Sequence, residues 1–337
     1  MAGWLIVLLQ IAAMFLVILL GWVVRRRAYL TAETTGALSR FVVDFTIPSL
    51  VLTQMLSTVN SASLRADWYV PLLGIVIFLL GQLIGMATTP FFARRDQRPT
   101  AIFLVATGNW IYLPLPIVSA LYHADGVRVV LLYNIGATLA LWTLGVWTLR
   151  GGRPDMKSLR ALGTNPGLIA TVAGIVLALL IPAARTLSTM DAGSAGGGSP
   201  VTLIAYVVYH AVDLVGSLTI PLSLVVTGAQ LGGLNLADHR PSRTLTGVLL
   251  ARLILTPAVA LALIWCAALA GFTLPPVPLM VGFIIAAMPP AISCSIFTDR
   301  FGGDTSLAAR AIFAGTLLSI ATVPVLFYLI HTIMQMA

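Results

Sequence analysis

Residues 253–298 contain no charged side chain, and this constrains the fold more than any other feature of the sequence. The stretch is too long for one membrane span, because about 20 apolar residues cross a bilayer. The whole chain has the same character, with 59% hydrophobic residues, 9% charged residues and a mean hydropathy of +1.00. A soluble globular protein carries about 25% charged residues. The sequence therefore predicts a polytopic membrane protein.

Segments of spanning length occur ten times, so the predicted fold class is an all-α membrane protein with ten transmembrane helices. The expected spans are 4–24, 38–57, 68–92, 100–122, 129–149, 166–181, 202–231, 305–330 and two more within 253–298, divided by the turn-forming residues 272–278. In the third span, Gly81 and Gly85 have the spacing that lets helices approach closely. Residues 183–200 have the composition of a flexible linker.

Two of the expected spans cannot be continuous helices. In the fourth, Pro114 and Pro116 remove two amide donors and disfavour helix in the residues before them, while Gly108 gives the backbone freedom. In the ninth, Pro289 and Pro290 form a second break. Unwound backbone at membrane depth survives only where it is buried in protein or lines a wet cavity. Two interrupted helices at matching places in two halves of a chain indicate the binding site of a secondary transporter.

Basic residues fall almost entirely in alternate loops of this topology. Of the 19 lysines and arginines, fifteen lie on one side, three (Arg65, Arg128 and Arg185) lie on the other, and Arg252 is within a span. The positive-inside rule places the fifteen in the cytoplasm and both chain termini outside. The net charge of +8 then reflects topology and not nucleic-acid binding. We expect a multi-pass protein of the bacterial cytoplasmic membrane.

The chain divides into two halves of five spans each. Residues 1–149 form the first half, residues 150–165 a basic cytoplasmic linker, and residues 166–337 the second half. An odd number of spans per half forces opposite orientations in the membrane, which is the inverted repeat common in carriers. Thr-Ile-Pro at 46–48 in the second span recurs at 219–221 in the seventh. The two broken spans also hold equivalent places, which supports a duplication.

Several short motifs occur in a characteristic order along the chain. They are residues 20–27, Gly108-Asn109 followed by Leu113-Pro114-Leu115, Ile220-Pro221, residues 226–231, residues 287–291, Gly302-Gly303-Asp304, and residues 316–319 ahead of Pro324. Together they resemble the auxin efflux carrier family of secondary transporters, which includes plant auxin exporters and bacterial malonate or malate permeases. The resemblance covers nearly the whole length of the chain.

This resemblance implies two inverted five-helix repeats, a scaffold domain, and a transport domain whose fourth and ninth helices cross at their prolines. It also implies a homodimer and an organic anion as cargo. The chain departs from the family at Trp110, Ile111 and Tyr112, which replace the small residues expected after the asparagine. Their bulk would narrow the site.

At such a crossing, the half-helix N-termini would point unpaired amides and positive dipole ends into the membrane. That arrangement is an anion site without a buried basic residue. Asn109 can supply two donors and an acceptor to a carboxylate, or instead join two helices by a hydrogen bond. The candidate substrate-binding residues are Gly108, Asn109, Tyr112, Pro114, Pro289, Pro290, Ser293 and Ser295.

Four other polar residues within spans are candidates for coupling or support, namely Asp44, Gln82, Asp213 and Arg252. Asp44 also lies near enough to the cytoplasmic end to reach water or to pair with Arg40. Asp213 follows His210 by three residues on one helical face, and the two could relay a proton. Arg252 fits either the neutralisation of a substrate carboxylate or a side chain that snorkels to the cytoplasmic side.

We expect a secondary carrier that moves a small organic anion, a mono- or dicarboxylate, by alternating access. We expect no cofactor and no metal site, and the partners would be the anion, membrane lipid and a second copy of the chain. The sequence has no Walker motif, paired aspartate motif or His-Glu-x-x-His, so an enzyme is not expected. Two alternatives stay open: a sensor or scaffold that has lost transport, which the bulk of Trp110 and Tyr112 favours, and a sodium-coupled carrier of the bile-acid type.

Overall fold

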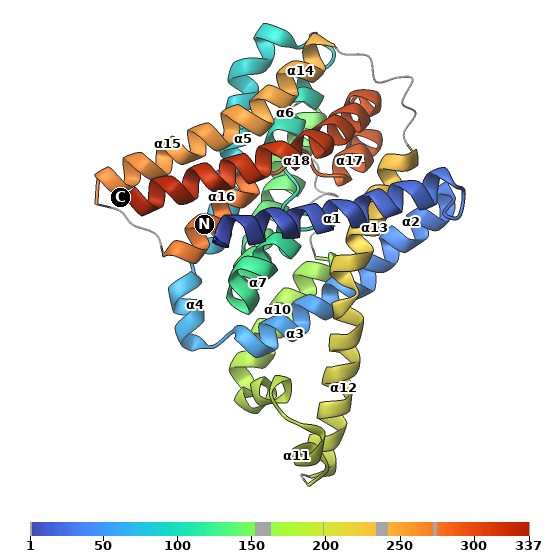
Figure 1. The fold of residues 1–337 in the computed structure, drawn as a ribbon, viewed down its shortest axis with the longest axis vertical. Coiled ribbons are helices and arrows are strands. Elements are labelled where there is room, and N and C mark those ends of the chain that lie inside the picture. Colours follow the sequence, from blue (N-terminus) through green and yellow to red (C-terminus); the bar gives the residue numbers. More distant parts are fainter. Residues whose placement is uncertain (1, 152–162, 198, 234–241, 272–274, 337) are drawn as a thin grey trace.

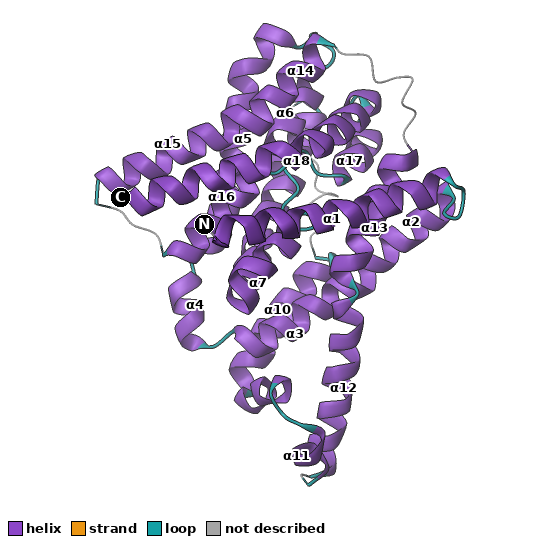
Figure 2. Ribbon diagram, viewed as in Figure 1, coloured by secondary structure: helices purple, strands orange, loops and turns teal. Residues whose placement is uncertain are grey.

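The computed structural model describes residues 2–151, 163–197, 199–233, 242–271 and 275–336, and the helices that they form are shown in Figures 1 and 2. In chain order the elements are α1 (Ala2–Arg26), α2 (Ala32–Phe41), η1 (Val42–Thr46), α3 (Ile47–Thr58), α4 (Ser61–Asp67), α5 (Val70–Phe92), α6 (Arg98–Ala106), α7 (Pro114–Ala140), η2 (Leu141–Gly145), α8 (Val146–Leu149), α10 (Pro166–Leu180), η3 (Pro182–Ser188), α11 (Ala192–Gly196), α12 (Pro200–Ser217), α13 (Thr219–Gly233), α14 (Arg243–Leu250), η5 (Ala251–Leu255), α15 (Thr256–Leu269), α16 (Pro276–Ala286), α17 (Ser293–Phe301) and α18 (Thr305–Met336). Within the described ranges, strand-like pairing is limited to one isolated bridge. The expectation of an all-helical chain is confirmed.

Six helical segments are long and apolar enough to cross a membrane. They are Ala32–Thr58, Ser61–Phe92, Pro114–Leu149, Pro200–Gly233, Arg243–Leu269 and Thr305–Ile330. Two shorter apolar helices are α10 and α16. The prediction of a multi-pass membrane protein is borne out by these segments. Most of the expected linker 150–165, and residues 272–274 of the expected turn, lie outside the described residues.

The segment Pro114–Leu149 turns inside α7 at His123. Its φ of 50° and ψ of −142° are not helical, so the chain changes direction between the expected fourth and fifth spans. Arg128 fastens this turn to α4, because its Nε donates to Asp67 Oδ2 at 2.9 Å and its Nη1 donates to Asp125 Oδ1 at 2.6 Å. Two ion pairs thus hold the corner between these two parts of α7.

The helices pack in two groups. In the first group, α1 lies along α13, and α3 packs against α10 and α12 (Figure 1). In the second group, α5 packs against α6, α7 and α14, α16 packs against α7, and α17 packs against α18. The groups meet where α7 contacts α1 and α3 and where α1 contacts α18. Both interrupted segments, α6 with α7 and α16 with α17, therefore belong to the second group.

Close packing of α5 on α6 depends on the two glycines of the third expected span. A Cβ on Gly81 would lie 2.8 Å from the Cα of Ala106, and a Cβ on Gly85 would lie 3.0 Å from the Cα of Ile102. Real Cβ atoms do not come this near to backbone without a shift of one helix. The close approach predicted from the Gly-x-x-x-Gly spacing is confirmed.

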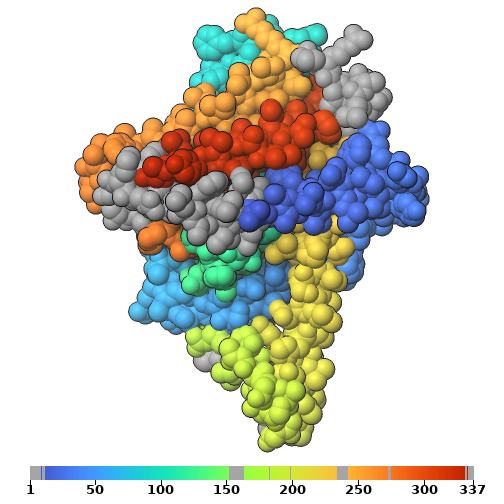
Figure 3. All heavy atoms as spheres, viewed as in Figure 1, coloured from blue at the N-terminus to red at the C-terminus, as the bar shows by residue number. Residues whose placement is uncertain are grey.

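Residues 183–197 differ from the flexible linker that their composition indicates. They form part of η3, which packs against α3, α10 and α12, and α11, which lies at the start of α12 at the lower tip of the molecule in Figures 1 and 3. Asp191 Oδ1 accepts a hydrogen bond from the Ser194 amide at 2.6 Å, which caps α11 and holds the pKa of the Asp191 carboxyl below its ordinary value. Ser199 Oγ caps α12 in the same way, accepting from the Thr202 amide at 3.2 Å. Side-chain caps give this glycine-rich stretch its local order.

Candidate functional site

Both expected interruptions are present. Residues 107–113 separate α6 from α7, and residues 287–292 separate α16 from α17. Pro114 is the first residue of α7, a position where the missing amide costs no hydrogen bond. Pro114 therefore determines where α7 begins, and the break lies in the residues before it.

The two breaks lie against each other as a short antiparallel pair. Gly108 and Pro290 form an isolated bridge. Two backbone hydrogen bonds flank it, from the Asn109 amide to the Pro289 carbonyl at 2.8 Å and from the Ala291 amide to the Thr107 carbonyl at 3.1 Å. Backbone polar groups in an apolar interior must find hydrogen-bond partners, and each break provides some of these partners for the other. The two interrupted segments therefore meet at Gly108 and Pro290.

Arg252 lies beside this pair, in the π-helical turn η5, and only 1% of it is exposed. Its guanidinium donates to three backbone carbonyls: from Nε to Met288 at 2.9 Å, from Nη1 to Val105 at 3.1 Å and from Nη2 to Ile285 at 3.2 Å. Val105 is in the last turn of α6, Ile285 is in the last turn of α16, and Met288 follows α16 in the second break. Arg252 therefore caps the C-termini of two half-helices at once.

The charge of Arg252 is balanced by these helix ends. A helix C-terminus carries about −0.5 of an elementary charge, so two of them offer about −1 to the guanidinium. None of the ion pairs found among the described residues involves Arg252. An unbalanced arginine at membrane depth costs about 3 kcal/mol or more, which the three carbonyls offset. A buried basic residue is thus present beside the paired breaks, contrary to expectation, and its burial contradicts the hypothesis of a side chain that snorkels to the cytoplasmic side.

Gly108 is needed for space and not for an unusual backbone angle. A Cβ at this position would lie 1.8 Å from Arg252 Nη2 and 2.6 Å from its Cζ. The described glycines with positive φ are Gly151, Gly271 and Gly302, so Gly108 has a backbone that other residues can adopt. The sequence predicted glycine here for backbone freedom, whereas the structure requires it because the guanidinium occupies the place of a side chain.

Asn109 is buried at the break, with 2% of the residue exposed. Its Oδ1 accepts a hydrogen bond from the Tyr112 amide at 3.0 Å, which closes a local turn and fixes the side chain. Nδ2 makes no hydrogen bond to the described part of the chain. The hydroxyl of Thr107 is also buried, and it too has no partner among the described residues. Buried polar atoms without a partner, such as the Thr107 hydroxyl, are rare, and both this hydroxyl and Asn109 Nδ2 are donors with no partner in the described chain beside the bridge.

Trp110 is turned toward α7. Its indole Nε1 donates to Asn134 Oδ1 at 3.0 Å, and Thr138 Oγ1 donates to the same oxygen at 3.0 Å. Trp110 is 9% exposed, so most of its bulk is packed in the interior of the second group. Asn134, supported by Thr138, thus joins the break to α7 through the indole of Trp110. The sequence did not predict this position of the Trp110 side chain.

The N-terminus of α7 offers fewer amide donors than expected. Pro114 and Pro116 have no amide, and the amide of Leu115 between them donates to the Ile111 carbonyl at 2.9 Å. The prolines that interrupt the helix thus also remove the donors that an anion would use. The first three residues of α7 therefore offer no free amide to an anion, fewer donors than the sequence predicts, while the positive end of the helix dipole remains.

The N-terminus of α17 is largely satisfied as well. Ser295 Oγ donates to the Ile292 carbonyl at 2.9 Å, and the Ser295 amide donates to the same carbonyl at 3.3 Å. The hydroxyl of Ser293 makes no hydrogen bond to another described group. Cys294 is fully buried, and its Sγ donates to the Thr107 carbonyl at 3.8 Å, across the pair of breaks. Of the two candidate serines, Ser293 keeps the free hydroxyl.

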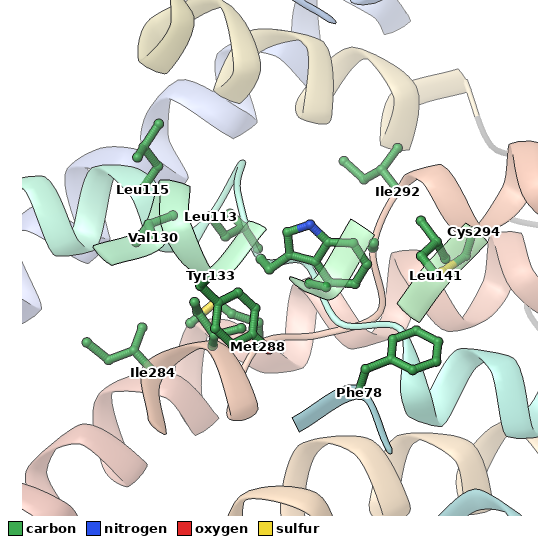
Figure 4. Close-up of a cluster of buried hydrophobic side chains, with 14 of the residues drawn as sticks. Phe78, Leu113, Leu115, Val130, Tyr133, Leu141, Ile284, Met288, Ile292 and Cys294 are labelled. Carbon is green, nitrogen blue, oxygen red and sulfur yellow. The ribbon is translucent and has the colours of Figure 1, made fainter. Parts of the chain in front are cut away.

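Apolar side chains enclose this region. Figure 4 shows Leu113 and Met288, one from each break, gathered with Tyr133 of α7 and Leu141 of η2. A cavity between α7, α16 and α18, lined in part by Ile117, measures about 10 Å³ and holds at most one water. Asn109 itself is only 2% exposed.

Three of the four residues proposed for coupling or support lie elsewhere. Gln82 is buried on α5, where its Nε2 donates to Thr148 Oγ1 of α8 at 2.5 Å and its Oε1 has no partner among the described residues. Asp44 is exposed on η1, and Asp213 is half-buried on α12, so both belong to the first packing group. His210 Nε2 is buried without a hydrogen bond, and no bond joins it to Asp213 in the described chain.

Two interrupted helices that pair at their breaks are a feature of membrane transporters. A family model described as membrane transport protein matches residues 6–158 and 153–327. The chain belongs to this family, the auxin efflux carrier family of transporters.

Two relatives extend the comparison. The chain is 24% identical over 320 residues to an uncharacterised transporter of Methanothermobacter thermautotrophicus, covering 93% of this chain and 95% of the relative. It is 25% identical over 336 residues to a protein of Rhizobium meliloti that bears the name "Putative malonate transporter", covering 94% of each. The protein is accordingly a membrane transporter and not an enzyme.

Proposed function

We propose that this protein is a secondary active transporter that moves a small organic anion, a carboxylate, across the cytoplasmic membrane by alternating access. The proposal includes ten spans arranged as two inverted five-helix repeats, with the two interrupted helices in the transport domain. It agrees with the family of the chain and with the name that the Rhizobium meliloti relative bears.

The observation that carries the proposal is the buried amide of Asn109. Its oxygen is held by the Tyr112 amide, so the side chain is fixed while Nδ2 remains a free donor beside the paired breaks. A carboxylate only accepts hydrogen bonds, so it pairs with Nδ2 and with the free hydroxyls of Thr107 and Ser293. Neutral donors bind an anion reversibly, as a carrier requires.

The charges around the breaks suit one carboxylate. The C-termini of α6 and α16 compensate Arg252, so its charge is not available to a substrate. The N-termini of α7 and α17 remain, and each offers about +0.5 of an elementary charge. Their sum of about +1 balances a single negative charge, which favours a monoanion or a dicarboxylate that carries one proton.

The enclosure of the breaks supports alternating access over open diffusion. Movement of the second packing group against the first would expose Asn109 alternately to either side. The rival hypothesis of a transport-inactive sensor depended on the bulk of Trp110 and Tyr112. Trp110 packs against α7 instead, so its bulk gives that hypothesis no support.

The test is flux of labelled malonate, malate, acetate and indole-3-acetate into proteoliposomes under imposed proton and sodium gradients. The key variant is Asn109→Asp, because it keeps an oxygen for the Tyr112 amide while it replaces the donor by a negative charge. We expect flux by the wild type and none by Asn109→Asp or Asn109→Ala, compared at equal amounts of folded protein, because a carboxylate buried at this depth also lowers stability. Wild-type flux that survives Asn109→Asp would rule out this site.

A further inference from the structure

A second site is indicated at the opposite end of α6 from the breaks. A cavity of about 520 Å³ lies where α5 ends, where α6 and α14 begin, and beside the second turn of α18. Its lining includes Arg94, Arg243 and Arg310, which come from three different parts of the chain. This is the upper end of the molecule in Figure 1, near the label of α14. The proposed transport function does not use it.

The arginines keep most of their donors free. Arg243 Nη2 donates to the Phe91 carbonyl at 2.7 Å, and Arg310 Nε donates to the Ser306 carbonyl of its own helix at 3.3 Å. A guanidinium has five N–H donors in a planar fork that matches phosphate oxygens. Each of these two side chains therefore has donors to spare for a ligand in the cavity.

The acidic residues nearby offset only part of this charge. Asp96 pairs with Arg94 at 3.4 Å, and both side chains are largely exposed. Both carboxylate oxygens of Asp304 are occupied, because Oδ1 accepts from the Leu307 amide and Oδ2 accepts from Gln97 Nε2. Neither aspartate is among the residues that line the cavity. The lining thus carries three positive charges, of which one is paired at the surface.

Helix ends add to the positive field. α6 begins at Arg98, directly after the lining residue Gln97, whose side chain does not cap the helix because it is bonded to Asp304. α14 begins at Arg243 within the lining itself. The N-terminus of α6 therefore lies beside the lining with its positive dipole end, whereas that of α14 is partly satisfied by Ser242 Oγ, which accepts from the Leu245 amide.

The edge of the cavity is apolar. Pro90 and Phe91 form part of the lining, and Phe91 is 75% exposed. A free inorganic anion has no use for an exposed aromatic ring, whereas a lipid needs an apolar surface for its acyl chains beside a polar pocket for its headgroup. Basic pockets between membrane helices on the cytoplasmic side are known to bind anionic headgroups. The combination favours a lipid over a soluble phosphate.

We propose that this cavity binds the phosphate headgroup of an anionic phospholipid, with Arg94, Arg243 and Arg310 on the phosphate and Phe91 along an acyl chain. The lipid would bridge α5, α14 and α18, and it would thereby stabilise the second packing group from its basic end.

The test measures binding of phosphatidylglycerol to the delipidated full-length protein by native mass spectrometry, with phosphatidylcholine and inorganic phosphate as comparison ligands. The variants are Arg310→Gln, whose hydrogen bond lies within its own helix, and the double variant Arg243→Gln with Arg310→Gln. The matched control is Arg95→Gln with Arg300→Gln, which removes the same charge from exposed positions outside the cavity lining.

An arginine near an anionic headgroup contributes about 1 kcal/mol, or roughly fivefold in affinity. We expect the single variant to weaken phosphatidylglycerol binding roughly fivefold and the double variant roughly 25-fold, while the control changes it less than about twofold. Equal losses in the control would reduce the effect to general surface charge and overturn the site. So would unchanged binding in the double variant. Stabilisation by inorganic phosphate without retention of phosphatidylglycerol would overturn the assignment to a lipid.

Discussion

Replacing Arg252 by methionine removes the guanidinium from the paired breaks and keeps an apolar side chain of similar reach. Three buried carbonyls, those of Val105, Ile285 and Met288, then lose their donor at the ends of α6 and α16. The two negative helix ends also lose the charge that balances them. Because the carbonyls belong to the backbone, no neighbouring side chain substitution can remove them.

The magnitude follows from opposing terms. Hydrogen bonds to a charged group contribute about 1.5–3 kcal/mol each, and three of them are lost. Removal of the buried charge also removes several kcal/mol of desolvation penalty. The net loss in the free energy of unfolding for Arg252→Met is therefore about 3–5 kcal/mol. We expect a fall in melting temperature of roughly 6–10 °C at about 2 °C per kcal/mol. Arg252→Lys keeps the charge, but one ammonium cannot reach all three carbonyls. Its melting temperature should therefore lie between those of the wild type and Arg252→Met.

Cys294 provides a local readout of the same change. It is fully buried with its Sγ on the Thr107 carbonyl, whereas Cys266 is exposed. In a Cys266→Ser background, Arg252→Met should make Cys294 react with a membrane-permeant maleimide, because the breaks separate. The matched control is Leu253→Ala in the same π-helical turn, which costs a comparable 2–5 kcal/mol or so by leaving a cavity but removes no hydrogen-bond donor.

Two results would refute this reasoning. One is an Arg252→Met protein with the same melting temperature as the wild type, since the guanidinium would then not be needed to satisfy the carbonyls. The other is Cys294 labelling in Arg252→Met that is no faster than in Leu253→Ala, since the loss would then be general destabilisation and not separation of the breaks.

Two further predictions concern the same region. Gly108→Ala should displace the guanidinium, destabilise the protein by an overpacking cost of about 1–3 kcal/mol in thermal melts, and expose Cys294 to maleimide. The control is Gly282→Ala, where the new Cβ would lie 3.6 Å from its nearest side chain. Equal behaviour of the two variants would contradict the argument. Asn134→Leu should cost about 1–3 kcal/mol in thermal melts because it leaves the buried indole N–H of Trp110 unpaired. Adding Trp110→Phe should then cost less than it does in the wild type, and strict additivity would disprove the coupling.

The breaks in the helices were predictable because their causes are local. Pro289 and Pro290 remove amide donors at their own positions whatever surrounds them, and the composition of the flanking segments places the break within a span. The role of Arg252 was not predictable in this way. It bonds Val105, 147 residues away, and nothing in the spacing of the two residues indicates the contact. The same holds for Trp110, whose partner Asn134 is chosen by the turn at His123 and the packing of α7.

The sequence by itself determined that this chain is a bundle of membrane helices and where two of those helices are interrupted. Lipid offers no partners to backbone polar groups, so apolar segments must be helical, and proline and glycine act at their own positions. Only the tertiary structure decided what satisfies the groups that the breaks release. Gly108 pairs with Pro290, and Arg252 collects the carbonyls at two helix ends. Asn109 Oδ1 takes the Tyr112 amide, and its Nδ2 bonds no group of the described chain. The physical reason is that a broken helix frees donors and acceptors in numbers set by sequence, whereas their partners are set by which distant segments the fold brings within hydrogen-bonding distance.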